Sequence, residues 1–445
     1  MAIDRRTVLK GIAAAPALMP SGYAMAQGLD ASQFGVRPDA ANDQSRALQR
    51  AIDQAASRST PLALRPGIYK AVGLTLPAGA SLAGVPGKTT LLLGGPGELL
   101  RADQAKGLTL RDLTFDGAAV PPGESALVMF SNGHSVKIAD CEFLRAGGTA
   151  LRLDAVAGAV TGCSFADSGD TALFSQDARG LLLSGNTIAR SGNGGIRVWQ
   201  SAKREDGTIV ADNRIEDTLA RSGGSGQNGN AINIYRGGNV IVRGNMVRNA
   251  AFSAVRGNAA NNLQITGNTC AGIGEVAIYA EFDFEGASIT GNVVDAAAIG
   301  IAVTNFNEGG RLATVQGNVL RNITKRRPAG TDPADDWGVG IGVEADTAVT
   351  GNVIENAANA GVNVGTGRYL RDVTVTGNVV RRASYGIIVS VSAGAGVAVV
   401  SHNVIADTPG GAVVGFDGRR PVTGDLAVSA GADHPKLTIF GNQLR

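Results

Sequence analysis

The stretch Val339–Asp346, VGIGVEAD, is a short extended segment whose counterparts recur about eleven times along the chain, each after an Asn-centred turn. Apolar residues alternate with small or polar ones in each copy, which favours β-strands over helices. Consecutive turn residues such as Asn245, Asn268 and Asn292 are 23 and 24 residues apart, and a nearly constant period of this length indicates stacked repeats. The turns are marked by a Gly-Asn step or a close variant, at Gly185-Asn186, Asp212-Asn213, Gly244-Asn245, Gly267-Asn268, Gly291-Asn292, Gly317-Asn318, Gly351-Asn352, Gly377-Asn378, His402-Asn403 and Gly441-Asn442.

Strands that alternate and stack at this period fit a parallel β-helix, in which each coil lies roughly 4.8 Å above the last. We therefore expect an all-β chain that forms one solenoid of about 12 coils, from about residue 62 to residue 445. Identical turn residues in neighbouring coils can pair amide to amide, so the Asn column is expected to be structural and not catalytic.

The first 26 residues have the composition of an export signal. Asp4–Lys10 contains paired arginines, an Ala-rich run follows to Pro20, and Ala24-Met25-Ala26 forms a small-x-small cleavage site. We expect residues 1–26 to be a signal peptide for the twin-arginine translocation machinery and residues 27–445 to be periplasmic or secreted. The remaining sequence contains no stretch apolar enough to span a bilayer, so no transmembrane segment is expected after signal removal.

Charge and cysteine content exclude several function classes. The formal net charge is +2, and residues 1–26 contribute +2 of it, which leaves the remainder near zero (2 − 2 = 0). A nucleic-acid binder needs a basic stripe, so no nucleic-acid partner is expected. The three Cys and three His do not occur at the spacing of a zinc site, and no metal site is predicted from them.

Two cysteines replace Asn in early turns. Cys141 and Cys163 occupy one column position in adjacent coils, so their Cα atoms are expected roughly 5 Å apart, within disulfide range. An oxidising compartment would permit the bond, but two thiols that simply replace ladder amides fit the pattern equally well. Cys270 falls where other copies have Val, Ile or Leu, which indicates a buried apolar position.

An amphipathic helix is expected over residues 43–58, where Leu48, Ala51, Ile52 and Ala55 share one face, and it would cap the exposed end of the solenoid. This helix, with Phe34-Gly35-Val36, Pro66–Tyr69 and Leu74–Gly84, resembles the opening of the pectate-lyase-like right-handed parallel β-helix superfamily. Leu108–Gly117 resembles its first full coils.

Together with the paired arginines, the chain resembles an uncharacterised family of twin-arginine-exported β-helix repeat proteins. The resemblance covers essentially all of residues 27–445 and implies right-handed coiling. It does not imply one activity, because the superfamily contains lyases, hydrolases, epimerases and binding proteins. The Gly-His-Gly and Arg-Ile-Lys motifs of polygalacturonases are absent, and no clear match to the calcium-and-arginine site of pectate lyases is found.

Outward-facing positions indicate where a ligand would bind. Residues that follow the inward apolar residue by one or three positions must face outward, because side chains alternate along a strand. Two long insertions, Leu219–Asn230 and Lys325–Trp337, occur at one corner beside these positions, and long loops on one corner usually frame a binding face. The first outward column contains Arg197, Asn233, Arg256 and Tyr279, and the second contains Trp199, Tyr235, Glu281 and Glu344.

This pattern predicts a groove for a long polymer. Trp199, Tyr235 and Tyr279 offer ring faces for sugars, with Asn233 between them in the same columns. Arg197 and Arg256 are expected to hold carboxylates of an acidic polysaccharide. An ordinary solvated sheet face would have a similar composition and is the alternative interpretation.

The candidate catalytic residues are Glu281, Glu344, Asp283 and Arg256. Glu281 and Glu344 share a column two coils apart, roughly 10 Å between Cα atoms, which suits the acid and base of an inverting glycosidase if the side chains lean together. Arg256 beside Glu281 and Asp283, with a bound Ca²⁺, would instead suit β-elimination at a uronate. A surface carboxylate cluster without chemistry is an equal alternative.

Three hypotheses follow. The first is an exported carbohydrate-active protein that binds, and in its enzymatic version also cleaves, an acidic polysaccharide by hydrolysis or β-elimination. The second is a non-catalytic glycan-binding or scaffold protein of the cell envelope. The third is a cofactor carrier, suggested only by the export route, since no cofactor motif is found in the sequence.

Overall fold

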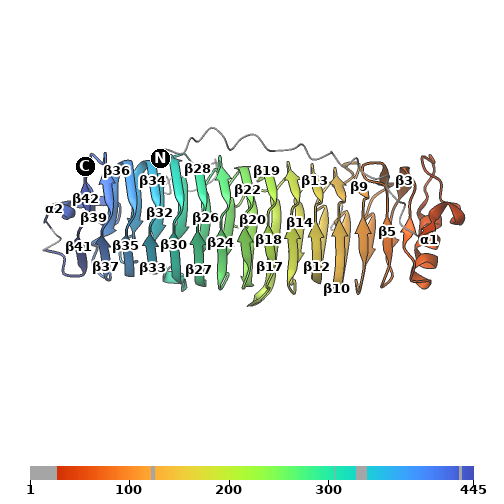
Figure 1. Cartoon of the computed structure of the whole chain (residues 1–445), viewed down its shortest axis with the longest axis horizontal. Helices are drawn as coiled ribbons and strands as arrows, with labels where there is room; N and C mark the ends of the chain where they lie inside the picture. The colour runs from red at the N-terminus through yellow and green to blue at the C-terminus, as the bar shows by residue number, and fades with distance from the viewer. Residues whose placement is uncertain (1–27, 122–125, 305, 327–337, 430–432) are drawn as a thin grey trace, which may run out of the picture.

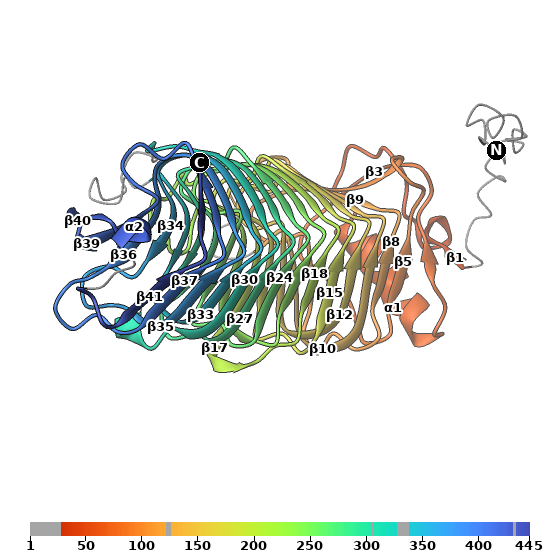
Figure 2. The ribbon, with the colours of Figure 1, turned by 60° about the vertical axis from the view of Figure 1, so that its left-hand side comes forward.

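The protein is one elongated stack of β-coils (Figures 1 and 2). The computed structural model describes residues 28–121, 126–304, 306–326, 338–429 and 433–445, so the predicted signal peptide lies outside the described residues. The long insertion predicted at residues 325–337 lies outside them as well, apart from its first two residues. Helix α1 (Ser45–Ser57) covers one end of the stack, and helix α2 (Leu426–Ser429) lies at the other end.

Each coil contributes strands to three parallel sheets, which we call the groove sheet, the second sheet and the third sheet. Strands β10 and β12 continue from the groove sheet into the second, while β34 and β36 begin in the third and end in the groove sheet. The groove sheet contains β4 (Leu74–Thr75), β7 (Leu100–Ala102), β10 (Val128–Ala139), β12 (Leu151–Thr161), β14 (Thr171–Gln176), β17 (Gly194–Glu205), β20 (Asn230–Gly238), β23 (Val255–Asn258), β26 (Val276–Glu281), β29 (Ile299–Val303), β32 (Val339–Val343), β34 (Val353–Val364), β36 (Val379–Ser390) and β39 (Val413–Asp417).

The other two sheets complete each coil. The second contains β2 (Leu62–Ala63), β5 (Ser81–Ala83), β8 (Thr109–Arg111), β15 (Leu181–Ser184), β18 (Ile209–Ala211), β21 (Ile241–Arg243), β24 (Leu263–Thr266), β27 (Glu285–Thr290), β30 (Arg311–Gln316), β33 (Ala345–Thr350), β35 (Arg371–Thr376), β37 (Ala398–Ser401) and β41 (Leu437–Phe440). The third contains β3 (Gly67–Ala71), β6 (Thr89–Leu93), β9 (Thr114–Asp116), β11 (Glu142–Leu144), β13 (Ser164–Ala166), β16 (Thr187–Ala189), β19 (Arg214–Thr218), β22 (Met246–Ala250), β25 (Thr269–Ala271), β28 (Val293–Ala297), β31 (Val319–Ile323), β38 (Val404–Ala406) and β42 (Gln443–Leu444).

The core is built from ladders of identical or similar apolar residues. In the groove sheet one ladder of paired residues runs from Leu74 to Val413, through Leu173, Ile232 and Ile301 among others, and all of these are buried. The inward column expected from alternation is therefore confirmed. Because every coil buries the same positions against its neighbours, burial of apolar surface stabilises the stack along its whole length.

The Asn column forms the continuous amide ladder that was expected. Asn292 donates from Nδ2 to Asn318 Oδ1 at 2.9 Å and to the Ile265 carbonyl at 3.0 Å, and its backbone N–H donates to the same Asn318 oxygen at 2.9 Å. The pattern repeats in each coil from Asn186 to Asn442. The residue before each ladder Asn is left-handed, with φ of 67° at Gly185, which explains why Gly usually stands there.

The three cysteines are free and buried, so Cys141 and Cys163 replace ladder residues as thiols. The Cys163 backbone N–H donates to Asn186 Oδ1 at 3.0 Å, which joins it to the amide ladder. The neighbouring thiol of Cys163, together with burial, holds the pKa of Cys141 well above its usual range, so this thiol stays protonated.

The cap helix α1 begins two residues later than the predicted Asp43, because Asp43 accepts hydrogen bonds from the Ser45 N–H at 3.0 Å and the Ser45 hydroxyl at 2.9 Å. It buries Leu48 and Ile52 against the first coil, as the sequence predicts. At the other end β39 turns back into β40 (Arg420–Asp425), which pairs with it antiparallel and ends the groove sheet.

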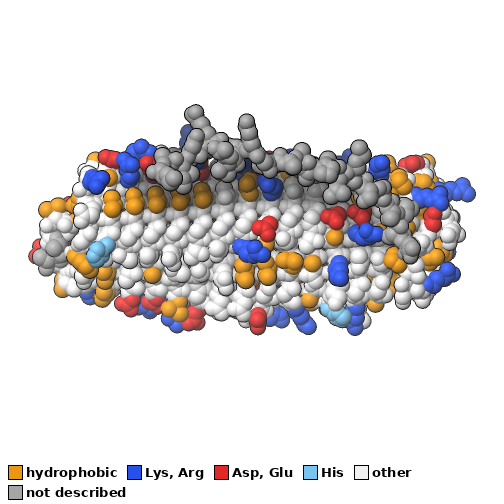
Figure 3. Space-filling view, in the orientation of Figure 1, with side chains coloured by type: hydrophobic (Ala, Val, Ile, Leu, Met, Phe, Trp, Pro, Cys, Tyr) orange, Lys and Arg blue, Asp and Glu red, His pale blue; other side chains and the backbone are white. Residues whose placement is uncertain are grey.

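The third sheet presents a row of outward valines, Val293, Val319 and Val353, each about two-fifths exposed. Figure 3 shows a row of hydrophobic side chains along the axis over the C-terminal half. Among the described residues, no helix has the length and apolar character that crossing a membrane requires.

Candidate functional site

The groove sheet brings the predicted site residues onto one wall. Its register pairs Arg197 with Asn233, Asn233 with Arg256, and Arg256 with Tyr279 in successive coils. The second outward column pairs Trp199 with Tyr235, and Asn258 with Glu281, as alternation predicts. Because the strands are parallel and in register, these side chains follow one another up the same face.

The insertion Leu219–Asn230 lies directly on this wall and covers part of it. Its backbone carbonyls accept from the wall: Gly226 from Asn233 Nδ2 at 2.9 Å and Ser225 from Arg256 Nη1 at 2.9 Å. Arg197, Asn233 and Arg256 are consequently only 6%, 2% and 6% exposed. The loop that was expected to frame the groove is therefore held by two predicted substrate-binding residues, Arg197 and Asn233, and by one predicted catalytic residue, Arg256.

Arg256 lies between two carboxylates. Its guanidinium makes two hydrogen bonds to Glu281, Nε to Oε1 at 2.6 Å and Nη2 to Oε2 at 2.8 Å, and Nη1 contacts Glu275 Oε2 at 3.3 Å. Burial alone would lower the pKa of Arg256, but the Glu281 and Glu275 carboxylates together outweigh burial, and the net effect raises the pKa. Asn258 Nδ2 donates to Glu281 Oε1 at 2.9 Å, so both Glu281 oxygens are engaged.

Tyr279 lies against the same cluster. The Arg256 guanidinium carbon is 4.8 Å from the centre of the Tyr279 ring, a cation–π contact. Burial, reinforced by the Glu281 charge, raises the pKa of Tyr279 to about 12. The phenol is therefore neutral at physiological pH and available as a hydrogen-bond donor.

Arg197 is the second buried arginine of the wall. Its Nη2 donates to Asn228 Oδ1 at 2.8 Å, and Nη1 lies 3.5 Å from Asp170 Oδ2. Burial lowers the pKa of Arg197, and Asp170 only partly offsets this. Its Nε has no hydrogen-bond partner, so this guanidinium is less completely satisfied than that of Arg256.

Two of the predicted aromatic residues, Trp199 and Tyr235, form a cluster with Phe174 whose rings meet edge to face. The Trp199 ring centre lies 5.7 Å from that of Tyr235 and 5.2 Å from that of Phe174, with interplanar angles of 64° and 76°. Trp199 Nε1 donates to Asn233 Oδ1 at 2.9 Å. Trp199 and Tyr235 remain half-buried, so part of each ring faces solvent beside the loop.

A cleft of about 460 Å³ opens on the groove sheet beyond the loop, over strands β23 to β34. It collects four of the predicted residues, Arg256, Tyr279, Glu281 and Glu344. Sequence reasoning did not single out the others, of which Ala302, Thr304, Gly342 and Asn363 lie in the two outward columns and the rest come from loops or from positions that alternation does not mark. Those others are Ser225, Glu275, Phe282, Ile299, Ala302, Thr304, Asn307, Val339, Gly342, Asn363, Thr366, Tyr369 and Arg419.

The remaining predicted catalytic residues lie apart from the Arg256 cluster. Glu344 lines the cleft and accepts the Phe306 N–H at 2.7 Å through Oε2. Asp283 lies at the strand end, is largely exposed, and pairs with Lys203 Nζ at 3.0 Å. The cleft therefore brings Glu281 and Glu344 together but places Asp283 outside it.

The cluster does not fit a calcium ion. Arg256 occupies the space between Glu275 and Glu281 and neutralises both, whereas Ca²⁺ needs six or more oxygen ligands free to turn toward it. Within the part of the chain that the structure describes, no three His, Cys, Asp or Glu side chains gather as a metal-binding group.

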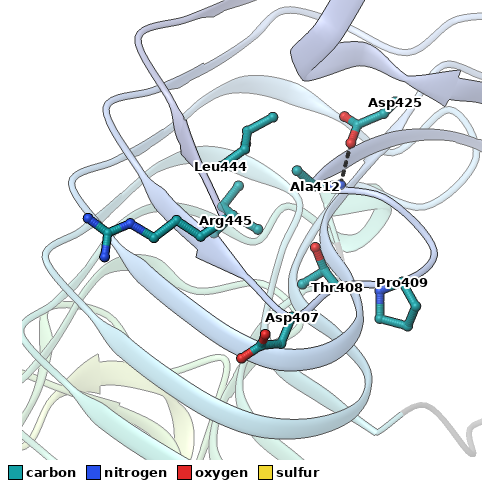
Figure 4. Close-up of a pocket in the computed structure, with 8 residues that line it drawn as sticks. Asp407, Thr408, Pro409, Ala412, Asp425, Leu444 and Arg445 are labelled. Atoms are coloured by element: carbon teal, nitrogen blue, oxygen red, sulfur yellow. Dashed lines mark hydrogen bonds between the residues drawn. The ribbon is translucent and has the colours of Figure 1, made fainter.

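A second hollow, of about 530 Å³, lies at the C-terminal end of the stack (Figure 4). Asp425 holds its two carboxylate oxygens toward backbone N–H groups, with Ala412 at 2.7 Å and Val413 at 3.1 Å. This carboxylate joins the final hairpin to the last coil, and we interpret the hollow as part of the end of the solenoid.

Comparisons with known proteins agree with this architecture. A family model described as a right handed beta helix region matches residues 99–250. No curated protein matches the sequence. Among solved structures, tailspike protein 3 of bacteriophage CBA120 is similar, with a TM-score of 0.51 and 14% identity over 93% of this chain and 61% of that chain.

Two further solved structures were also matched. The A-module of a mannuronan C-5 epimerase from Azotobacter vinelandii has a TM-score of 0.43 and 15% identity over 94% of this chain and 99% of that chain. The catalytic unit of an alpha-1,3-glucanase from Streptomyces thermodiastaticus has a TM-score of 0.46 and 14% identity over 94% of this chain and 69% of that chain. Identities this low show the fold alone. The stacked parallel sheets described above form a single parallel β-helix over the described residues, and the family model that matches residues 99–250 is that of a right-handed one.

Proposed function

We propose that this protein binds a polysaccharide in the cleft over strands β23 to β34. The observation that carries the proposal is the lining of the cleft, where hydroxyl, amide and carboxylate groups stand beside the rings of Tyr279 and Tyr369. Sugars need both many hydrogen-bond partners and flat apolar faces. The cleft also extends over five successive coils, about 20 Å at one strand spacing per coil, which suits a polymer better than a small molecule.

A glycan array with the purified protein tests this proposal. We expect at least one polysaccharide to be retained, and Tyr369→Ala to weaken its binding about tenfold or more, since a stacking ring contributes roughly 1–2 kcal/mol. Phe440→Ala is the matched control, because Phe440 is an exposed aromatic residue on the second sheet. Retention that is equal for Tyr369→Ala and wild type would place the ligand elsewhere and contradict the proposal.

Cleavage of the bound polymer is the second candidate function. The observation that favours it is the presence of Glu281 and Glu344 in one cleft. Both Glu281 oxygens already accept hydrogen bonds from Arg256, so we take Glu344 as the candidate proton donor or acceptor.

Glu344→Gln tests cleavage, because Gln keeps the acceptor for the Phe306 N–H while removing the acid. If the protein is an enzyme, the variant should bind the polymer as well as wild type does and release neither reducing ends nor unsaturated uronates. Wild-type protein that binds the same polymer without ever releasing product would instead favour the glycan-binding or envelope-scaffold function.

We also propose export by the twin-arginine route, on the basis of residues 1–26. Replacement of both Arg5 and Arg6 by Lys should retain the full-length protein in the cytoplasm, whereas wild type should appear, shortened at its N-terminus, outside the inner membrane. Unchanged export of the double variant would overturn this assignment.

A further inference from the structure

We propose that another hollow, at the end of strand β17 and separate from the one at the C-terminal end of the stack, is a subsite for an anionic sugar substituent, a carboxylate or a sulfate. This inference rests on the proposed polysaccharide binding and adds the charge class of the ligand. The hollow has a volume of about 460 Å³ and lies beside the cleft, with Phe282 lining both. Its lining includes Ser201, Lys203, Tyr235, Arg236, Phe282 and Asp283.

The hollow exists because β17 contains extra residues at its end. Trp199 pairs with Tyr235, and the next pair is Arg204 with Gly237. Between these two pairs β17 advances by five residues while β20 advances by two. The additional residues leave the sheet as an arch, and the end of β17 protrudes beyond its neighbours in Figure 2. Before and after the insertion the ladders are in register, with Ile196 opposite Ile232 and Ile209 opposite Ile241.

The arch is held at both ends. At its base, Gln200 is buried and donates to the Ala178 carbonyl at 3.1 Å and to Asp206 Oδ2 at 2.7 Å. At its tip, Lys203 reaches the coil of β26, where its ammonium group contacts the carboxylate and the carbonyl of Asp283. The arch therefore crosses the ends of β20 and β23 and forms one wall of the hollow.

Two cations line the hollow against one acid. Arg236 uses Nη1 to donate to the Ser201 carbonyl at 3.0 Å, and its guanidinium carbon lies 4.7 Å from the centre of the Tyr235 ring. A guanidinium has five N–H donors, so Arg236 retains donors for an incoming anion. Lys203 is about one-third exposed and shares its charge with Asp283. These two side chains replace the buried Arg197 and Arg256 as the groups that a ligand carboxylate can reach.

Phe282 connects the hollow with the cleft. It is 39% exposed and has a left-handed backbone, with φ of 59°, which L side chains adopt rarely. This conformation holds a large ring in solvent between the two cavities. If one sugar unit of a polymer occupies the cleft, the chain would run past this ring and place a neighbouring unit beside Arg236 and Lys203.

Matched ligands and variants test the subsite. An acidic polysaccharide retained on the array is compared with its carboxyl-reduced or desulfated form, which separates the two sources of negative charge. We expect wild type to prefer the anionic form about tenfold or more, and Arg236→Gln to lose most of that preference, as for loss of one charge-assisted hydrogen bond. Arg243→Gln is the control, because Arg243 is an exposed arginine on the second sheet and should leave the preference unchanged.

The outcomes separate this inference from the proposed function. If the polymer binds but wild type does not distinguish its charged and neutral forms, the subsite is wrong and polysaccharide binding stands. If Arg236→Gln keeps the full preference, the subsite is also wrong. If no polymer binds, glucuronate and glucose 6-sulfate serve as probes: binding that Arg236→Gln abolishes supports the subsite alone, and no binding overturns both proposals.

Discussion

The charge of Arg256 is the central feature at the scale of single residues. A buried guanidinium is tolerated only where carboxylates neutralise it, and here Glu275 and Glu281 do so from two directions. The same geometry limits what Glu281 can do chemically, because both of its oxygens already accept hydrogen bonds. Arg256 and Glu281 thus hold the loop and shape the cleft wall, whichever reaction the cleft supports.

Removal of the Glu281 charge should destabilise the middle coils. Glu281→Gln leaves Arg256 with Glu275 alone, and an incompletely compensated buried charge costs about 3 kcal/mol, which lowers the urea midpoint of unfolding. Asp283→Asn should change stability by less than about 0.5 kcal/mol, because its pair with Lys203 is exposed. An unchanged midpoint for Glu281→Gln would show that the buried pair is not needed for stability.

Asp346 should make the protein less stable at acidic pH. Hydrogen bonds from Arg371, at 2.6 and 2.7 Å, outweigh burial and lower the pKa of Asp346 below its usual 3.8. A group whose pKa is lower in the folded state stabilises the fold above its unfolded pKa, and that stabilisation is lost as pH falls through the folded pKa. As the pH falls below about 4, the thermal unfolding temperature of wild type should therefore decrease more than that of Asp346→Asn. An equal decrease in unfolding temperature at low pH for wild type and Asp346→Asn would contradict this prediction.

The Asn ladder decides stability at the scale of elements. Each amide, such as that of Asn292, bonds four backbone or side-chain groups in the two neighbouring coils, so the ladder connects coils where the turn would otherwise leave buried groups unpaired. The ladder also explains why the turn sequence is so constant while the outward columns vary.

In Asn292→Ala, the backbone N–H and the side-chain Nδ2 of the buried Asn268 lose the oxygen to which they donate. The Ile265 carbonyl loses the Nδ2 group that donates to it. Unpaired buried groups cost about 1–3 kcal/mol each, so we expect a loss of at least about 2 kcal/mol in urea unfolding. Thr266→Ala, which loses an exposed hydroxyl contact with Thr290 in the neighbouring coil, should cost less than about 0.5 kcal/mol. Equal midpoints for the two variants would show that the ladder is not stabilising.

The register of the wall could be predicted from sequence because it depends only on local alternation and the repeat. Tyr279 and Glu281 therefore appear on the predicted face, in the predicted order. The sequence could not predict that the loop Leu219–Asn230 covers part of this face. That arrangement depends on where the carbonyls of Ser225 and Gly226 lie in three dimensions. Glu275 and Lys203 were missed for the same reason, because a corner and a bulge bring them to the site.

At the scale of the molecule, the solenoid is an elongated stack whose ends need covering. Helix α1 buries Leu48 and Ile52 over the first coil, and each further coil pairs its strands with those of the coils on either side. The groove sheet is therefore a continuous track, with the β17 arch, the loop at Leu219–Asn230 and the final hairpin projecting from it as barriers.

Deletion of residues 28–58 should expose the apolar first coil and its unpaired strand edge. We expect the variant to self-associate in size-exclusion chromatography with light scattering, because open edges and core positions pair with other chains. Arg46→Ala, on the solvent side of α1, is the control and should elute as wild type does. A deletion variant that elutes like wild type would show that the helix is not a necessary cap.

The most direct test of the account is a crystal structure of the protein with the oligosaccharide that it binds best. The account predicts sugar units in the cleft against Tyr279 and Tyr369, with a neighbouring unit past Phe282 beside Arg236. A ligand bound on the second or third sheet, with the cleft empty, would contradict it.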